Sequence, residues 1–238
     1  MIPEGLSVTL VEPRYPVNVG HVARLLKNFG VKKLYMVKPK VDISVAAVYA
    51  SHASDVLDQA VVTTFERVRK ENELLIATTA VRASKKSNVI RRSVGPERLG
   101  QLLASSRTSS LVFGRDTTGL TNEEIRKCDV TTTIVTGSSY RALNLGHAVA
   151  ILLYMASRGA RGKGGMQTRE AREVFAKSFY GLAAASRVPP HKMKSLFQSG
   201  RKIATVSRLS DRDLNLMSGV FRKALLTLDS LQDLDSKT

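Results

Sequence analysis

Over the first 157 residues, short runs of mostly apolar residues alternate with stretches of helical spacing. Leu6–Val11, Lys33–Val37 and Leu74–Thr79 have the length and composition of buried strands. Between the first two, apolar residues recur at positions 19, 22, 23 and 26, which predicts an amphipathic helix from Asn18 that stops at Gly30. A strand, a helix and a strand in this order normally build a parallel sheet, so the pattern predicts an α/β fold.

The same reasoning predicts the other elements of this part of the chain. A strand is expected at 61–63, and helices are expected at 44–57, 64–72 and 96–106. Two more strands, Ser110–Phe113 and Val130–Val135, each run into a loop of small and polar residues that opens into a helix, at Thr121–Lys127 and from Asn144 onwards. The first of these helices starts with the spacing of a capping box. Because ligands bind beyond the carboxyl ends of strands in open α/β sheets, the two loops predict a ligand pocket.

The pattern changes after residue 157. Residues 158–167 are rich in glycine and predict a linker, and the remaining chain has only helical spacing, with helices expected at 168–185, 191–206 and 210–231. We therefore expect one α/β domain over 1–157, a linker, and a small all-helical domain over 168–238.

The charge of the chain changes this picture most. Lys and Arg number 37 against 20 acidic residues, a formal net charge of +17, which is typical of proteins that bind a nucleic-acid phosphate backbone. The plain alternative is a basic surface that is merely solvated. The basic loop 82–92 and the basic helical tail are the expected RNA contacts.

Several classes of protein are not expected. There is no apolar run of about 20 residues and no signal-peptide pattern, and the single cysteine, Cys128, fits a buried position in a cytoplasmic protein. No membrane partner is expected. Without paired cysteines or an H-E-x-x-H motif, and with four dispersed histidines, neither a structural zinc nor any other metal is expected.

Three blocks of residues carry a resemblance to a known family. They are Asn18-x-Gly20-x-x-x-Arg24, Phe113-Gly114-Arg115-Asp116-x-x-Gly119-Leu120, and Tyr140-Arg141-Ala142-Leu143-Asn144. In this order and spacing they resemble the SPOUT superfamily of RNA methyltransferases, in the branch that methylates the ribose 2′-hydroxyl. Residues 6–157 are most similar to the enzymes that modify cytidine, and possibly uridine, at nucleotide 32 of the tRNA anticodon loop.

The resemblance implies properties that composition cannot show. The fold would be a parallel sheet with a deep trefoil knot at its C-terminal side, an exception to the general absence of knots. The protein would be a homodimer with sites completed by the partner chain, and its substrate would be tRNA. S-adenosylmethionine would be held in the knot by three loops that contain Thr78, Thr79, Ala80, Gly114, Ile134, Arg141, Ala142, Leu143 and Asn144.

The resemblance also implies which residues act on the substrate. Arg24 matches the catalytic arginine of the family, and Asn18 and Asp116 stand at its other catalytic positions. A guanidinium group resists deprotonation. Arg24 could act as the base only if its environment favours the neutral form. Alternatively, it could orient the ribose and neutralise charge while another group takes the proton.

Each of these residues also has a plainer interpretation. Asn18 and Asn144 could cap their helices, and Arg24 could be a solvated charge. Gly114 and Gly119 could serve a turn that needs positive φ, with or without a contact to the cofactor. His147 is expected to have a packing or surface role.

Two positions depart from the family. The family commonly has Glu where Asp116 stands and Ser where Ala142 stands. A role of the serine hydroxyl is therefore absent here or is supplied by Ser138, Ser139 or Tyr140.

Two other functions remain open: a non-catalytic RNA-binding protein on the same scaffold, and a 2′-O-methyltransferase that acts on ribosomal RNA or on another tRNA position.

Overall fold

The computed structural model describes residues 2–80, 93–137, 140–158, 167–186, 188–207 and 209–235. It consists of two compact units, Met1–Lys163 and Gly164–Thr238. The predicted basic loop 82–92 lies outside the described residues, and so does most of the predicted linker 158–167.

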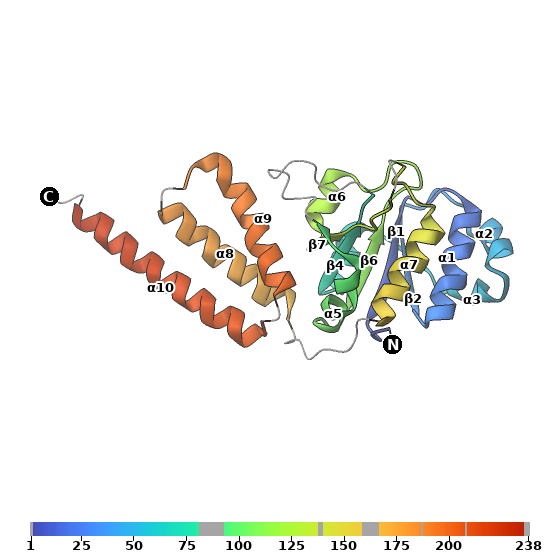
Figure 1. Ribbon diagram of the computed structural model, residues 1–238, viewed down its shortest axis with the longest axis horizontal. Coiled ribbons are helices and arrows are strands. Elements are labelled where there is room, and N and C mark those ends of the chain that lie inside the picture. Colours follow the sequence, from blue (N-terminus) through green and yellow to red (C-terminus); the bar gives the residue numbers. More distant parts are fainter. Residues whose placement is uncertain are drawn as a thin grey trace. The chain divides into compact units, whose positions relative to one another are not determined.

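The first unit is built on a seven-stranded sheet in which every pair of neighbouring strands is parallel, in the order β3-β2-β1-β6-β4-β7-β5 (Figure 1). The parallel α/β prediction is confirmed. The strands are β1 (Leu6–Val11), β2 (Lys33–Val37), β3 (Val61–Thr63), β4 (Leu74–Thr78), β5 (Ser93–Val94), β6 (Ser109–Phe113) and β7 (Val130–Thr132). Strand β5 was not predicted because two residues carry no periodicity. The expected strand 130–135 was too long, since the ladder to β4 ends at Thr132.

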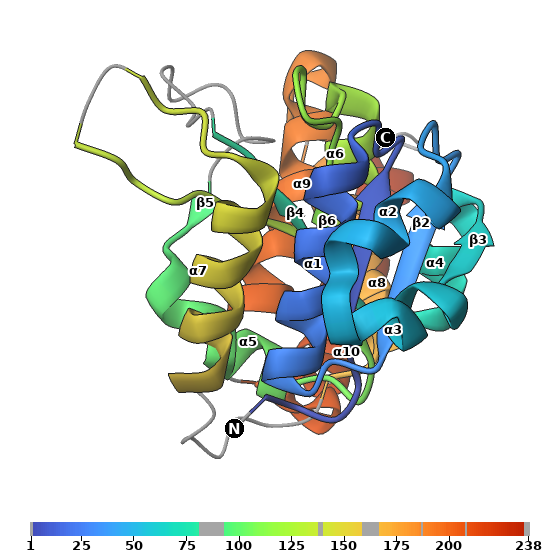
Figure 2. The same ribbon diagram turned by 90° about the vertical axis from the view of Figure 1, so that its right-hand side faces the viewer.

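Helices cover both faces of this sheet. On one face α1 (Pro16–Phe29) lies between α7 (Leu145–Arg158) and the pair α2 (Ile43–Ala50) and α3 (Ser54–Asp58), as Figure 2 shows, and α5 (Leu99–Ala104) packs against α7. On the other face α4 (Phe65–Glu71) and α6 (Asn122–Lys127) bury a cluster that includes Tyr35, Val68 and Ile125. Apolar residues on both faces explain why the strands are short, continuous apolar runs.

Two helix predictions were wrong in their boundaries. Helix α1 begins at Pro16, not at Asn18, because proline suits the first helical position, where its fixed φ is helical and no N–H is needed. The helix expected over 44–57 is broken at Ser51, where φ is 51° and a short 3₁₀ turn separates α2 from α3. Gly30 ends α1 in the left-handed conformation, as predicted.

The second unit is all helical, as predicted. It consists of α8 (Arg169–Ala185), α9 (Pro190–Val206) and α10 (Asp211–Asp235), and α8 packs against both of the others. Ala171, Phe175, Ala204 and Leu214 form its buried core. In the described ranges of both units, no helix is long and apolar enough to cross a bilayer.

Helix α1 crosses α2 closely at Gly20. A Cβ at this position would lie 2.6 Å from the Cβ of Tyr49 and 2.7 Å from the carbonyl oxygen of Ala46. Because backbone and Cβ atoms cannot move aside without shifting a helix, the crossing requires glycine.

We predict that Gly20→Ala lowers the free energy of unfolding of the first unit by about 1–3 kcal/mol, through overpacking. Gly219→Ala is the matched control, since Gly219 lies within α10 with no atom near its missing Cβ, and alanine there should stabilise the helix by up to about 1 kcal/mol. Urea denaturation followed by circular dichroism measures both. An unchanged stability of Gly20→Ala would contradict the close crossing.

Candidate active site

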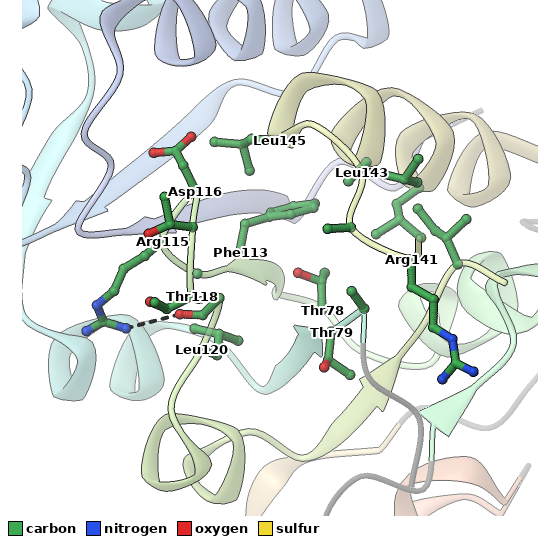
Figure 3. Close-up of a pocket in the computed structure, with 18 of the residues that line it drawn as sticks. Thr78, Thr79, Phe113, Arg115, Asp116, Thr118, Leu120, Arg141, Leu143 and Leu145 are labelled. Carbon is green, nitrogen blue, oxygen red and sulfur yellow. Dashed lines mark hydrogen bonds between the residues drawn. The ribbon is translucent and has the colours of Figure 1, made fainter. Parts of the chain in front are cut away.

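A cavity of about 290 Å³ opens beyond the carboxyl ends of β4, β6 and β7 (Figure 3). These three strands are neighbours in the sheet, so the loops that follow them converge although they are far apart in sequence. The volume is close to the lower end of the range for small-molecule sites, about 300–1,000 Å³. The walls are Thr78, Thr79, Ala80, residues 113–120, Thr132, Ile134, Arg141, Ala142, Leu143, Leu145, Ala148 and Leu152.

The structure brings most of the expected site residues together here. Of the nine residues expected at the cofactor, eight line the cavity, and Asn144 does not. Asp116 also lines it, whereas Asn18 and Arg24 do not. Ser138 and Ser139 lie outside the described residues, and the side chain of Tyr140 is 80% exposed and is not part of the cavity wall.

A chain of hydrogen bonds joins the cavity to α1 and α7. The Nδ2 of Asn18 donates to Oδ1 of Asp116 at 2.5 Å, and the Nδ2 of Asn144 donates to Oδ1 of Asn18 at 2.9 Å. The Oδ1 of Asn144 accepts from the backbone N–H of Gly146 at 2.9 Å, and the other carboxylate oxygen of Asp116 accepts from the N–H of Arg14 at 3.2 Å. Asn18 is 98 residues from Asp116 and 126 residues from Asn144 in sequence. The hydrogen bonds therefore fix three distant segments of the chain relative to one another.

This arrangement tests the capping interpretation of the two asparagines. Asn18 is not a helix cap, because it lies inside α1 and is 9% exposed. Both polar atoms of its side chain form hydrogen bonds, one with Asp116 and one with Asn144. Asn144 does cap α7, because its side-chain oxygen Oδ1 accepts a hydrogen bond from the N–H of Gly146, the second residue of that helix. Its amide group additionally holds Asn18, so the cap prediction is confirmed but incomplete.

Arg115 fixes the loop that carries Asp116. Its guanidinium binds both carboxylate oxygens of Glu124 at 3.0 Å and Oε1 of Glu12 at 2.7 Å, and it donates to the carbonyl of Gly119 at 3.2 Å. In Figure 3 the side chain extends away from the cavity. Arg115 therefore supports the cavity wall from behind.

Charge and burial both act on this ion pair. The hydrogen bonds that Arg115 donates to Glu124, the larger effect, and to Glu12 raise the pKa of Arg115 above its ordinary value. Burial alone would raise the pKa of Glu124, but the bonds from Arg115 and from the Thr121 N–H outweigh burial, and its pKa lies below the usual range. The predicted capping box of α6 is confirmed, with Thr121 Oγ1 accepting from the N–H of Glu124 at 3.2 Å. Glu124 thus caps α6 and anchors Arg115 at the same time.

The two glycines of this loop have different tasks. Gly119 has a φ of 68°, which favours glycine, as one interpretation predicted. Gly114 does not have positive φ, so that interpretation was wrong for it. A Cβ at Gly114 would instead collide with the backbone of Gly119 and Leu120, because the loop folds back on itself there.

Arg24 lies on the exposed side of α1. It is six residues after Asn18, about 9 Å along the helix axis. Among the residues that the structure describes, Arg24 has no hydrogen-bond or ion-pair partner that would hold its side chain in place. Its guanidinium is therefore available to a substrate or to a partner chain.

The cavity fits a nucleoside-type cofactor in its chemistry. Apolar side chains such as Phe113, Ile134 and Leu143 line it beside threonine hydroxyls and exposed backbone. Within the described residues, the buried hydroxyls of Thr133 and Thr136 on the segment after β7 have no hydrogen-bond partner, although neither residue lines the cavity. In the same residues no group of three or more His, Cys, Asp or Glu side chains is placed to hold a metal.

The family model described as the SpoU rRNA Methylase family matches residues 5–154, the part of the chain that contains the whole cavity. The chain belongs to the SpoU rRNA methylase family. The family match confirms the resemblance that the three motifs carried.

Named members of the family have similar sequences. Two archaeal proteins, both named tRNA (cytidine-2′-O-)-methyltransferase TrmJ, are 36% identical (Sulfolobus acidocaldarius) and 40% identical (Methanocaldococcus jannaschii) over 151 and 152 residues. These matches span 63% of this chain and 63% and 66% of those relatives, less than two thirds of their length. The tRNA (cytidine/uridine-2′-O-)-methyltransferase TrmJ of Escherichia coli K12 is 28% identical over 91% of this chain and 94% of its own.

Solved structures share the fold. The crystal structure of TrmJ from Z. mobilis ZM4 superposes with a TM-score of 0.63, covering 91% of this chain and 97% of that one at 22% identity. An rRNA methyltransferase from Sinorhizobium meliloti, solved with AdoMet bound, has a TM-score of 0.53 at 20% identity and covers 68% and 60% of the two chains. At these identities the likeness establishes a common fold.

Sequence reasoning missed the supporting roles of Glu12, Arg14 and Arg115, and it assigned Glu124 only to the capping box of α6. Arg115 lies inside a motif, but nothing in the sequence says that its partners are 9 and 103 residues away. Glu12 adopts a φ of 47°, an unusual value for a residue with a side chain, and this strain would be visible only in a structure.

We predict that Asn18→Ala and Asn144→Ala each destabilise the first unit, Asn18→Ala by about 1–3 kcal/mol, because these variants remove hydrogen bonds of Asn18, which is only 9% exposed. In the double variant the two effects should differ from additivity by about 0.5–3 kcal/mol, as measured by chemical denaturation. His147→Ala, an exposed position on α7, is the control and should be neutral. Strict additivity of Asn18→Ala and Asn144→Ala would show that the bond between them carries no energy.

Proposed function

We propose that this protein transfers a methyl group from S-adenosylmethionine to a ribose 2′-hydroxyl of tRNA, at nucleotide 32 of the anticodon loop, on cytidine and uridine. The observation that carries the proposal is the Asp116–Asn18–Asn144 chain of hydrogen bonds, which joins a nucleoside-sized cavity to the helix of Arg24. The named TrmJ relatives support the substrate class.

In this proposal the cavity is the cofactor site. Eight wall residues contact S-adenosylmethionine: Thr78, Thr79, Ala80, Gly114, Ile134, Arg141, Ala142 and Leu143. Asn144 lies at the edge of the site and holds the first turn of α7 in place. When bound, the cofactor supplies an electrophilic methyl group. The walls exclude water and hold the acceptor oxygen in line for transfer.

Arg24 is the proposed catalytic residue. Because a guanidinium group resists deprotonation, we assign it to orienting the ribose and neutralising negative charge. Its exposure and its lack of a carboxylate partner among the described residues leave its donors free for a phosphate or hydroxyl oxygen.

Asn18 and Asp116 are proposed to act through position. Their side chains bond to each other, so they set the distance between α1 and the cavity loop. Asp116 is one methylene shorter than the glutamate that the family commonly has, and its carboxylate still accepts a hydrogen bond from Asn18 at 2.5 Å.

We further propose that the C-terminal strands form a deep trefoil knot and that residues 1–157 are the methyltransferase domain, 158–167 a linker and 168–238 an RNA-binding domain. The strand order β6-β4-β7-β5, in which strands consecutive in sequence are not neighbours, supports the knot. The net charge of +17 supports RNA binding, with the basic loop 82–92 and the tail as contacts.

A homodimer through the outer side of α1 and α7 is also proposed. These helices lie side by side (Figure 2), and their outward residues include exposed apolar ones, Val17 at 40%, Ile151 at 38% and Tyr154 at 51%. Arg24 follows Val17 by seven residues, so it lies on the same outward side of α1. A dimer would therefore carry Arg24 towards the partner chain, which supports a site completed by two chains.

The function is tested by incubating tRNA with the protein and methyl-labelled S-adenosylmethionine, followed by nucleoside mass spectrometry. We expect 2′-O-methylcytidine or 2′-O-methyluridine that maps to nucleotide 32. Arg24→Ala should lower methyl transfer by at least about 100-fold, since orientation is lost, while calorimetry shows unchanged cofactor binding. Lys27→Ala, which removes another cation of α1, is the control and should be nearly neutral.

Other outcomes identify the alternatives. Methylation of ribosomal RNA or of another tRNA position keeps the chemistry and changes the target. Cofactor or RNA binding without any methyl transfer by the unaltered protein would support a non-catalytic RNA-binding protein. Near-normal transfer by Arg24→Ala would overturn the assignment of that residue.

We predict that Ile151→Asp with Tyr154→Asp converts a dimer into monomers in sedimentation velocity and lowers methyl transfer with it, because charges in a buried interface are costly. Val62→Asp, on the exposed edge strand β3, is the control and should leave the dimer intact. A dimer that persists in the double variant would place the interface elsewhere.

A further inference from the structure

The three helices of the second unit differ sharply in charge. Helix α9 carries four Lys or Arg residues and no acidic residue, whereas α10 carries three basic and five acidic residues. The basic character of the tail is therefore not spread evenly. A polyanion is attracted to α9 and is not attracted to α10.

The aromatic residues of α8 point in two directions. Phe175 and Phe179 pack against Phe221 of α10, with ring centroids 5.6 and 5.9 Å apart. Tyr180 lies about 100° further round α8 than Phe179 and instead meets Phe197 of α9 edge-on, at 5.9 Å. The α10 side is thus closed by packing.

Tyr180 is still 40% exposed, although its ring packs perpendicular to that of Phe197. An edge-on contact leaves much of an aromatic ring uncovered and restricts its motion. A partly exposed ring held by a second ring is a surface on which a nucleobase can stack.

Two exposed lysines flank this ring. Lys177 lies one turn before Tyr180 on α8, and Lys194 lies one turn before Phe197 on α9, so both project to the same side as the aromatic pair. The nearest acidic residue on that side, Glu173, is 3.2 Å from the guanidinium of Arg201 and is neutralised by it. The positive charge beside Tyr180 is therefore uncompensated.

We propose that Lys177, Tyr180, Lys194 and Phe197, here called the Tyr180 face, bind single-stranded RNA, with one unpaired base on the Tyr180 ring and adjacent phosphates on the two lysines. The proposal rests on the function proposed above and names the part of the tail that grips the substrate. It assigns no RNA contact to α10.

The test measures binding of the full-length protein to an unmodified tRNA transcript by fluorescence anisotropy over a range of salt concentrations. Tyr180→Ala should weaken binding about 5- to 150-fold, the range for loss of one stacked base. Tyr180→Phe keeps the ring and should bind as the unaltered protein does. Thermal unfolding is recorded for both variants, so that loss of folding is recognised.

The charge arm uses matched pairs. Lys177→Ala with Lys194→Ala should weaken binding and reduce the slope of log affinity against log salt by about 1.4–1.8. Arg222→Ala with Lys223→Ala removes the same charge from exposed positions of α10. This control pair should lower the affinity and the slope much less than the first pair does. Equal losses in the two pairs would overturn the Tyr180 face, because net charge alone would then explain binding.

Duplex RNA provides the last arm. The loss caused by Tyr180→Ala should appear with a single-stranded 12-nucleotide RNA and not with a 12-base-pair duplex. Wild-type affinity of a folded Tyr180→Ala protein for tRNA would overturn the inference while leaving methyl transfer, measured separately, intact. Failure of methyl transfer by the unaltered protein would instead overturn the proposed function and leave the binding results standing.

Discussion

The hydrogen bond between Asn18 and Asp116 is the constraint on which the site depends. It ties the first helix to the loop after β6, and Asn144 extends it to the helix after β7. Asn18 is only 9% exposed, and both polar atoms of its side-chain amide find their partners in Asp116 and Asn144. Helix α1 and the loops that follow β6 and β7 are thereby held in one arrangement beside the cavity.

The electrostatics of the first unit serve the same geometry. Arg115 is surrounded by Glu124, Glu12 and the Gly119 carbonyl, so its charge is used internally and faces away from the cavity. Arg24 differs in having no such partners among the described residues. Of two arginines in neighbouring motifs, one builds the wall and the other is free to act on a substrate.

In the second unit, apolar packing and charge are divided between the two sides of α8. Phe175 and Phe179 close the side towards α10, which leaves Tyr180 and α9 to form a basic surface with an exposed ring. The proposed RNA substrate needs cations that bind its phosphates and an aromatic ring on which an unpaired base of a loop can stack. The distribution of charge among helices is more informative here than the net charge of the tail.

By itself, the sequence determined the parallel α/β class, the three C-terminal helices, the capping box at Thr121 and the family, because periodicity, capping and ordered motifs are local properties. It did not determine the start of α1 at Pro16, the two-residue strand β5 or the break at Ser51, where the local signal is short or ambiguous. Most expected cofactor residues do converge on one cavity. The partnership of Asn18 with Asp116 and of Arg115 with Glu12 was decided only by the tertiary structure, since a hydrogen bond across about a hundred residues leaves no periodic trace in the chain.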